Sequence, residues 1–333
     1  MQRRRLLELA AATGAGLGAW RNAQAAVQDE TWRDQRRERD VPVRLRWPAG
    51  DGPCALIVHS HGLGGSRDGA DAWGHAWQQA GFAVLHLQHP GSDTDVLRAL
   101  RALRALRAAA SAEQLRARVA DMQFAVDEIA RRAHESAGPP QARVPERAPG
   151  WSRVRLAALG ASGHSFGAVT VQALAGQRFA LPTPGSIEPR FKAFVAFSPS
   201  PGQGLPAGEA FAGLTRPFLA VTGSLDSDVL GRGLTAEDRT RVYDSLPPGQ
   251  RALLWLEGAD HMTFGGNAEP RLRARFGPLK RERVAAENEV LHHERVAAIT
   301  TLWWRAKLLG DAQAIAALRA PVGLGEGDRW RQD

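Results

Sequence analysis

The stretch VRLAALGASGHSFGAVTVQALAG, residues 154–176, places a glycine-x-serine-x-glycine pattern between two apolar segments. Residues 154–159 are mostly apolar and predict a short buried strand. Residues 168–175 are typical of an apolar helix that ends at Gly176. The glycines of the pattern let the backbone turn where a Cβ would clash. The stretch therefore predicts a strand, a sharp turn with Ser165 at its apex, and a helix.

Ser165 stands where a nucleophile elbow has its serine, with the Oγ projecting from the edge of a sheet. A serine hydroxyl is a weak nucleophile, so it needs a base, an acid that orients the base, and donors for the oxyanion. A structural serine on a glycine-rich turn is the alternative that the five residues alone leave open. The flanking segments and the partners described next favour the catalytic interpretation.

The candidate acid follows a predicted strand. Residues 217–223 predict a strand that opens into SLDSD, residues 224–228. Ligands of open α/β sheets bind at the carboxyl ends of the strands, so an acid placed here lies at the right edge. Asp226, three residues after the strand-ending glycine, is the favoured acid, and Asp228 is the fallback. The alternative for either residue is a turn or a helix N-cap.

His261 is the predicted base because it follows a further apolar strand, residues 252–256, and comes after Asp226 in the chain. Its Nε2 would accept the serine proton while its Nδ1–H donates to the aspartate. An isolated histidine is more often structural or exposed. His292 and His293 are weaker candidates for the base because they lie inside a predicted helix.

The oxyanion donors are predicted from the loop HSHGLGG, residues 59–65, which follows a predicted strand at residues 56–59. A loop in this position supplies one oxyanion N–H, and the residue after the nucleophile supplies the other. The predicted donors are therefore the backbone amides of Leu63 and Phe166.

A metal site is the competing interpretation of this part of the chain. Its candidate ligands are His59, His61, His86 and His89. Zinc sites favour histidine clusters, but the only short pair here is His-x-His, and a zinc site would leave the glycine-x-serine-x-glycine pattern unexplained. The sequence therefore predicts no catalytic metal and no cofactor.

Strands and helices are predicted to alternate along the chain, which is the signature of an α/β fold with a mostly parallel sheet covered by helices on both faces. The predicted strands are 41–47 (at an edge of the sheet), 56–59, 82–87, 154–159, 191–197, 217–222 and 253–256. The predicted helices are 70–80, one or two within 95–133, 168–175 and 290–308. Trp303 and Trp304 in the last helix are expected to pack in the core.

The N-terminus predicts export. Three arginines precede an apolar stretch at residues 6–20, and an A-x-A cleavage pattern follows at residues 23–25. The run RRLL, residues 4–7, resembles a twin-arginine signal, which exports folded proteins in bacteria. The apolar stretch of 15 residues contains Glu8 and is too short and polar for a good membrane span. A basic amphipathic helix is the alternative for this segment.

The domain organisation follows from these segments. We expect an export signal at 1–25, a charged and loosely packed lead-in at 26–40, one α/β domain at 41–318 and a C-terminal tail at 319–333. The expected location is the periplasm or the outside of the cell, without a stable membrane anchor.

The charge of the chain, +8, does not predict a nucleic-acid partner, because the arginines are spread through helices and form no recognisable binding motif. Removal of residues 1–25 takes away four arginines and one glutamate and leaves +5. Cys54 is the single cysteine, so an internal disulfide is impossible. The oligomeric state is left open.

Five motifs together resemble a known family. They are HSHGLGGSR (59–67), HPGSD (89–93), GHSFGA (163–168), GSLD (223–226) and GADHMTF (258–264). With these motifs the chain resembles α/β-hydrolases of the dienelactone-hydrolase-like and platelet-activating-factor-acetylhydrolase-like branch, over residues from about 40 to about 318. The resemblance implies an α/β-hydrolase fold and a serine esterase acting on short or unusual acyl esters.

The chain departs from this branch in three ways. Dienelactone hydrolases use a cysteine where this chain has Ser165. In the eukaryotic acetylhydrolases the acid follows the strand after the elbow, but here that strand, 191–197, ends in Ser198 and Pro199, so the acid must come from the next strand. Polyester-degrading relatives are usually disulfide-bridged, which this chain cannot be.

The expected function is hydrolysis of a small-molecule or lipid carboxylic ester through a Ser-His-Asp triad and an acyl-enzyme. The same triad would also serve amide, thioester or lactone hydrolysis. A binding protein on a hydrolase fold that has lost turnover is the alternative of a different class.

Overall fold

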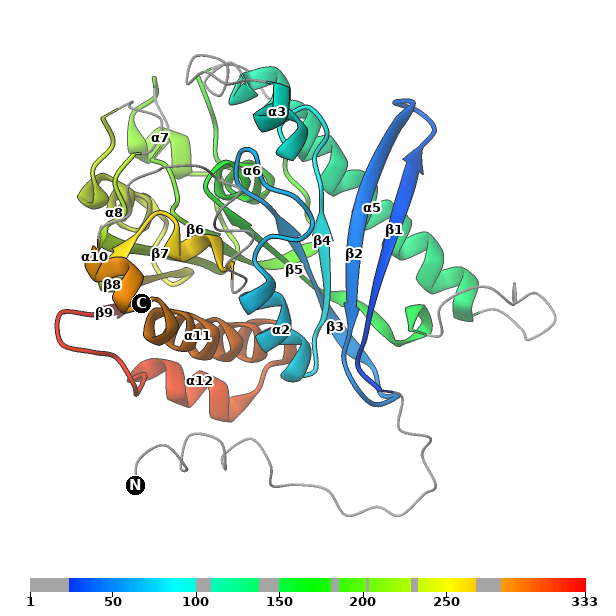
Figure 1. The fold of residues 1–333 in the computed structure, drawn as a ribbon. Helices are drawn as coiled ribbons and strands as arrows, with labels where there is room; N and C mark the ends of the chain where they lie inside the picture. Colours follow the sequence, from blue (N-terminus) through cyan, green and yellow to red (C-terminus); the bar gives the residue numbers. More distant parts are fainter. Residues whose placement is uncertain are drawn as a thin grey trace.

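The computed structural model describes residues 24–99, 109–137, 150–180, 186–201, 204–228, 233–267 and 283–333. Their strands form one nine-stranded sheet in the order β1-β2-β4-β3-β5-β6-β7-β8-β9 (Figure 1). The pairings from β4 to β8 are parallel, and the pairings β1–β2, β2–β4 and β8–β9 are antiparallel. The predicted α/β class with a mostly parallel sheet is confirmed.

The strands are β1 (Ala26–Asp34), β2 (Arg39–Trp47), β3 (Cys54–Ser60), β4 (Ala83–Leu87), β5 (Val154–His164), β6 (Phe191–Phe197), β7 (Phe218–Leu225), β8 (Arg251–Asp260) and β9 (Arg329–Gln332). The helices are α2 (Asp71–Gln79), α3 (Thr94–Ala99), α5 (Ala112–Ala137), α6 (Phe166–Ala175), α7 (Ala207–Phe211), α8 (Ala236–Ser245), α10 (Arg283–Glu287), α11 (Glu289–Leu309) and α12 (Ala312–Arg319). Two short 3-10 helices, η2 (Trp151–Arg153) and η3 (Thr263–Gly265), precede β5 and follow β8.

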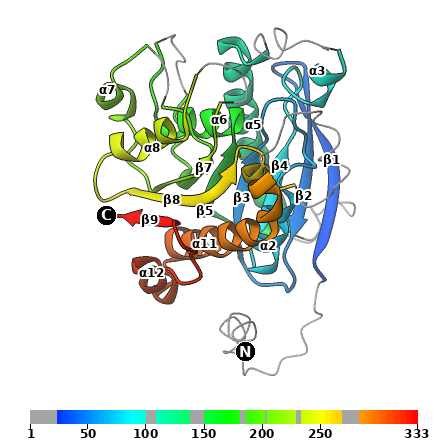
Figure 2. The ribbon, with the colours of Figure 1, turned by 60° about the vertical axis from the view of Figure 1, so that its left-hand side comes forward.

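Helices cover both faces of the sheet, as predicted. Helices α5, α6, α7 and α8 contribute to one buried cluster, and α2, α11 and α12 contribute to the other. Figure 2 shows α6, α7 and α8 above the sheet and α11 and α12 below it. Because both faces are buried, the central strands are mostly apolar and do not alternate regularly with polar residues.

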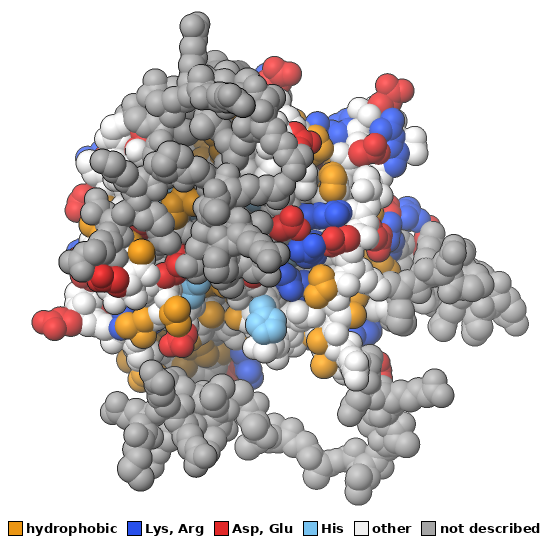
Figure 3. Space-filling view, viewed as in Figure 1, with side chains coloured by type: hydrophobic (Ala, Val, Ile, Leu, Met, Phe, Trp, Pro, Cys, Tyr) orange, Lys and Arg blue, Asp and Glu red, His pale blue; other side chains and the backbone are white. Residues whose placement is uncertain are grey.

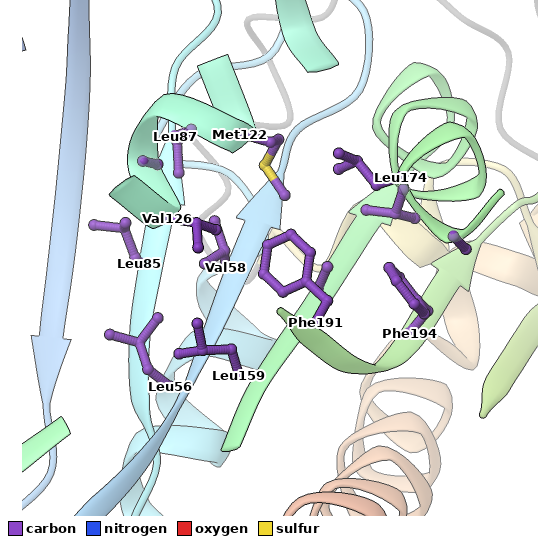
Figure 4. Close-up of a cluster of buried hydrophobic side chains, with 14 of the residues drawn as sticks. Leu56, Val58, Leu85, Leu87, Met122, Val126, Leu159, Leu174, Phe191 and Phe194 are labelled. Atoms are coloured by element: carbon purple, nitrogen blue, oxygen red, sulfur yellow. The ribbon is translucent and has the colours of Figure 1, made fainter. Parts of the chain in front are cut away.

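The core follows from the alternation of side chains along these strands. On β3, Leu56 and Val58 point to the α5 side, where they lie with Met122 and Val126 (Figure 4). The intervening apolar residues of β3 point to the α2 and α11 side. Cys54, the first residue of β3, is buried, and burial raises the pKa of its thiol.

Trp303 and Trp304 of α11 are also buried, as expected from the sequence. Large aromatic side chains bury much of the surface between packed elements, so these two tryptophans help to fix the orientation of α11 against the sheet.

The charged segment 26–40 is not a lead-in. It forms β1 and the turn into β2, and it completes one edge of the sheet. Its charges pair across the hairpin and to neighbouring elements, for example between Asp29 and Arg44 at 2.8 Å and between Arg33 and Asp40 at 3.1 Å. Such a charge density is typical of the solvent-facing side of an edge strand and does not indicate loose packing.

Two further expectations are wrong at the edges of the sheet. β2 was expected at an edge, but it lies between β1 and β4, with Val41, Val43 and Leu45 buried. The alternation that suggested an edge reports one buried face and one polar face instead. The C-terminal segment 319–333 was expected as a tail, but Arg329–Gln332 forms β9 beside β8.

Most predicted elements are found with shifted ends. β5 continues from the predicted 154–159 to His164, and β8 extends from the predicted 253–256 to Arg251–Asp260. Apolarity locates a strand but does not show where backbone pairing stops. The expected export signal lies, apart from residues 24 and 25, outside the described residues. Within the described ranges, no helix has the length and apolarity needed to cross a membrane.

Charged side chains are mixed on the surface. Figure 3 shows basic and acidic side chains beside one another, and among the residues drawn in colour no large block of one sign stands out on this face. The pairs Arg44–Asp68 (2.9 Å) and Arg67–Asp29 (3.4 Å) are part of this mixture. On this face, the described charged side chains are dispersed.

Candidate active site

The candidate site lies at the topological switch point of the sheet, where successive strands stop being added on one side of β3 and begin to be added on the other. Strand β3 has β4 on one side and β5 on the other, and the later strands continue outward from β5. In open parallel sheets a crevice forms at such a point, outside the carboxyl ends of the strands. Ser60 at the end of β3 pairs with Gly163 near the end of β5, so the loops that follow these strands start side by side.

Ser165 sits on a sharp turn between β5 and α6. Its φ of 55° and ψ of −113° lie outside the backbone regions that residues other than glycine prefer. Such a conformation costs about 1–3 kcal/mol and persists only where surrounding contacts enforce it. Here the Ser165 N–H donates to the carbonyl of Phe197 at 2.9 Å, and the Ser165 carbonyl accepts from Val169 at 3.1 Å.

The two glycines of the pattern are required by close packing. A Cβ on Gly163 would overlap the carbonyl of Gly167, and a Cβ on Gly167 would overlap the carbonyl of Ser60. Neither glycine has a positive φ, so space and not backbone freedom explains both positions. The N-terminus of α6 therefore packs directly on the end of β3.

The structure brings Ser165, His261 and Asp226 into one hydrogen-bonded row. His261 Nε2 lies 2.9 Å from Ser165 Oγ, and His261 Nδ1 lies 2.8 Å from Asp226 Oδ1. Asp226 is fully buried and His261 is nearly so. These distances allow the imidazole to accept the serine proton while its other nitrogen donates to the carboxylate.

The carboxylate of Asp226 is held ionised. Burial alone would raise its pKa, but the charge of Arg239 and the hydrogen bond from His261 outweigh burial and lower the pKa below its usual value. Arg239 Nε lies 3.0 Å from Asp226 Oδ1, and the Thr222 hydroxyl donates to Oδ2 at 2.8 Å. A charged, oriented carboxylate is what the partner of a catalytic imidazole requires.

Arg239 is a site residue that the sequence did not indicate. It lies on α8, is nearly buried, and donates to the carbonyls of Ser198 and Pro199 at 3.1 and 3.0 Å. It thereby ties the end of β6 to the loop that carries Asp226. One arginine within a polar amphipathic helix gives no local signal, so this role depends on tertiary contacts alone.

The remaining candidates for the acid and the base lie elsewhere. The carboxylate that binds His261 Nδ1 is that of Asp226 and not that of the fallback, Asp228. The Asp228 N–H donates to the carbonyl of Leu234 at 2.9 Å. His292 Nε2 binds the carbonyl of Glu257 at 3.0 Å, and His293 Nε2 binds the carbonyl of Thr263 at 3.1 Å.

The two predicted oxyanion donors lie on adjacent segments. Phe166 is the first residue of α6, where the backbone N–H has no partner within the helix. Leu63 lies in the loop after β3, which is fixed by Gly64 N–H donating to Ser92 at 2.9 Å and by Gly65 N–H donating to Gly62 at 3.0 Å. Among the described residues, no acceptor is found for the Leu63 or Phe166 N–H.

The four histidines considered as metal ligands are each engaged by protein groups. The bonds are His59 Nδ1 to Ser162 Oγ (2.9 Å), His61 Nδ1 to the Gly62 carbonyl (2.6 Å), His86 Nδ1 to the Gly69 carbonyl (3.1 Å) and His89 Nδ1 to Asp121 Oδ2 (2.9 Å). In the part of the chain that the structure describes, no group of three or more His, Cys, Asp or Glu residues is arranged to hold a metal ion.

A second Ser-His-Asp row begins at Ser60, just before the loop that carries Leu63. Ser60 Oγ is 2.9 Å from His89 Nε2, and His89 Nδ1 is 2.9 Å from Asp121 Oδ2. All three side chains are fully buried, and Arg118 lies 3.3 Å from the same Ser60 hydroxyl. A substrate carbonyl cannot reach the buried Ser60, so the row of Ser60, His89 and Asp121 has a structural role. Of the two rows, the one that ends in Ser165 has the serine that is partly exposed.

No protein-family model matches the chain. A search of curated proteins likewise finds no relative. The function of this site is therefore inferred from its residues and their geometry.

Substitution of Gly167 tests the packing at the elbow. We expect Gly167→Ala to lower the free energy of unfolding by about 1–3 kcal/mol or more, because the new methyl group meets backbone that cannot rotate away. Gly52→Ala, where no atom lies within 4 Å of the new Cβ, serves as the control and should change it by less than about 0.5 kcal/mol. Urea denaturation compares the two, and equal stabilities would contradict the close approach.

Buried neutral histidines predict acid lability. Burial lowers the pKa of His59 to about 3 and of His89 to about 4, and it lowers the pKa values of His61, His86 and His164 well below the usual value. The unfolded chain protonates its histidines near pH 6.5 and so binds more protons below this pH than the folded state. Stability is therefore present above pH 6.5 and is lost as the pH falls.

Each of these histidines contributes a slope of about 1.4 kcal/mol per pH unit below about pH 6.5. We expect the free energy of unfolding, measured in urea between about pH 7.5 and 4.5, to fall by several kcal/mol per unit in the acid range. His59→Asn, which keeps a polar group near Ser162, should reduce the proton uptake by about one. A stability that stays level from pH 6.5 to 5 would show that these side chains are not held neutral.

Proposed function

We propose that this protein is a serine hydrolase that cleaves carboxylic esters through an acyl-enzyme. The observation that carries the proposal is the hydrogen-bonded row from Asp226 through His261 to Ser165, set on a strained turn at the carboxyl edge of the sheet. A serine so placed, with a base and an orienting acid, has the parts that acyl transfer needs.

In the proposed reaction, Ser165 Oγ attacks the ester carbonyl carbon while His261 Nε2 takes the hydroxyl proton. The carbonyl oxygen becomes an oxyanion that the Leu63 and Phe166 amides bind, a contribution worth a few kcal/mol per donor in comparable sites. The bond to the alcohol then breaks, and His261 returns the proton to the leaving oxygen. A water molecule then attacks the acyl carbon while His261 takes its proton, the bond from the acyl carbon to Ser165 Oγ breaks, and His261 returns the proton to Oγ.

Two features support the assignment of roles. Asp226 is ionised and holds the Nδ1–H of His261, so the imidazolium formed during the reaction has a negative partner. The Phe166 amide stands at the N-terminus of α6, where the helix dipole favours negative charge. The proposal requires no metal and no cofactor.

The motifs around these residues also support membership of the dienelactone-hydrolase-like and acetylhydrolase-like branch of α/β-hydrolases. On that basis we propose small-molecule or lipid esters with short or unusual acyl chains as substrates. The arginine-rich, apolar N-terminal segment supports export to the periplasm or the medium. Amide, thioester and lactone substrates would use the same residues and are separated from esters by assay.

Ester hydrolysis that depends on Ser165 is the first expected result. We expect turnover of p-nitrophenyl esters, highest for short acyl chains, and a loss of at least about 10⁴-fold in kcat for Ser165→Ala. Ser152→Ala, an exposed serine in η2, is the matched control. A fluorophosphonate probe should label the wild type and not Ser165→Ala. Lack of both turnover and labelling in the wild type would instead favour a non-catalytic binding protein.

The choice between two aspartates provides a second test. Asp226→Asn should lower kcat by about 10⁴-fold, because an amide at this position favours the wrong imidazole tautomer. Asp228→Asn should lower it by less than about threefold, since Asp226 occupies the position at Nδ1. Steady-state kinetics on p-nitrophenyl acetate compares the variants. A large loss for Asp228→Asn with little loss for Asp226→Asn would reverse the assignment.

A further inference from the structure

We infer that Arg118 is a positioning residue for the oxyanion site, and that it acts by orienting and polarising the peptide between Gly62 and Leu63. This inference rests on the function proposed above. Leu63 supplies one proposed oxyanion donor, its N–H, and the carbonyl of the same peptide unit belongs to Gly62. Because a peptide is planar and trans, whatever fixes the direction of the carbonyl also fixes the N–H, which points the opposite way.

Arg118 binds the backbone of this loop from the side of α5. Its Nη1 donates to the His61 carbonyl at 2.7 Å, and its Nη2 lies 3.3 Å from the Gly62 carbonyl. Its Nε donates to the Ser92 hydroxyl at 2.8 Å, and Ser92 accepts from Gly64 through its own carbonyl. The rigid guanidinium fork thus holds two successive carbonyls of the loop at the same time.

His61 supports the same carbonyl from a second direction. Its Nε2 accepts from the His89 N–H at 3.0 Å, which leaves the proton of the neutral ring on Nδ1. This Nδ1–H donates to the Gly62 carbonyl at 2.6 Å. Burial keeps the pKa of His61 well below its usual value, so the ring stays in this neutral form. The Gly62 carbonyl therefore faces three donors, namely His61, Arg118 and the Gly65 N–H.

The charge of Arg118 acts from a buried position. The side chain is fully buried, and although burial lowers its pKa to about 9, it remains cationic at neutral pH. A cation at the carbonyl end draws electron density through the peptide and makes its N–H a stronger donor. A stronger N–H donor stabilises the transition state more than the bound substrate, because the substrate oxygen carries negative charge only in the transition state.

The hydrogen bonds of the Asp121 carboxylate go to groups other than Arg118. Its Oδ1 accepts from Arg37 and Arg39, and its Oδ2 accepts from His89. Arg118 instead donates to carbonyl groups and hydroxyls, and its Nη2 also lies 3.2 Å from Nδ1 of His61. The negative charges of Asp121 and Asp93 still act on Arg118, but among the described residues neither forms a direct ion pair with it.

Arg118 also contacts the second donor. Its guanidinium carbon lies 4.5 Å from the centre of the Phe166 ring, and the Phe166 N–H is the other proposed oxyanion ligand. One buried side chain thus packs on both segments that would form the oxyanion site. No motif in the sequence marks Arg118, which lies within the amphipathic helix α5.

The test compares transition-state and ground-state binding in the full chain. For Arg118→Met we expect kcat on p-nitrophenyl acetate to fall by about 10- to 100-fold while KM changes by less than about threefold. A trifluoromethyl ketone, which forms an oxyanion adduct with Ser165, should lose affinity by the same factor. The matching methyl ketone should bind as it does to the wild type.

Arg118→Lys covers the case in which Arg118→Met does not fold. It keeps the charge but cannot hold two carbonyls at once, so it should show a smaller loss with the same selectivity for the trifluoromethyl ketone. Arg132→Met is the matched control, because Arg132 lies on the same helix with its guanidinium over Trp32 at 4.7 Å, away from the site. It should keep kcat within about threefold of the wild type.

The inference fails if the Arg118 variants that fold keep kcat within about threefold, or if both ketones lose affinity alike, which would indicate a general structural role. It also fails if Arg132→Met reproduces the loss. The result for Ser165→Ala separates this failure from the failure of the proposed function. Turnover that depends on Ser165 but not on Arg118 overturns this inference alone, whereas a wild type without such turnover overturns both.

Discussion

The carbonyl of Ser60 lies so close to Gly167 that a methyl group there would overlap it, and the remaining geometry of the site depends on this approach. It brings the first turn of α6 onto the end of β3 and sets the elbow beside the loop that carries Leu63. The strained backbone at Ser165 then has no room to relax, because Phe197 and Val169 hold it from both sides. A packing constraint, more than any single hydrogen bond, positions the candidate nucleophile.

Two buried arginines stabilise the polar groups around this point. Arg239 joins the end of β6 to the loop of Asp226, and Arg118 joins α5 to the loop after β3. Both donate mainly to backbone carbonyls, which have fixed positions, and both are removed from solvent. Desolvating an arginine is costly, so such residues are retained only where many donors are satisfied at once. The loops of the site thereby become as fixed as the strands that precede them.

The sequence predicted the α/β class and brought together the residues of the candidate triad, because each lies just after an apolar strand. Parallel strands end at one edge, so order along the chain was enough to place Ser165, Asp226 and His261 near one another. The roles of Arg118 and Arg239 were not predictable in this way, since each acts on elements distant in sequence. The edge strands β1 and β9 were not predicted, because β1 is rich in charged residues and β9 has only four residues. Neither therefore shows the apolar run by which a strand is recognised, although the backbone can pair whatever its side chains are.

Cys54 has a consequence for experiments on this protein. It is the single cysteine of the sequence, it is buried at the start of β3, and its thiol is harder to ionise than that of an exposed cysteine. Thiol reagents act on the thiolate, so we expect the buried Cys54 of the folded protein to react slowly near neutral pH. A cysteine introduced on the surface would then be the one site that reacts. Spectroscopic labels can therefore be attached near the elbow or the loop that carries Leu63 without first replacing Cys54.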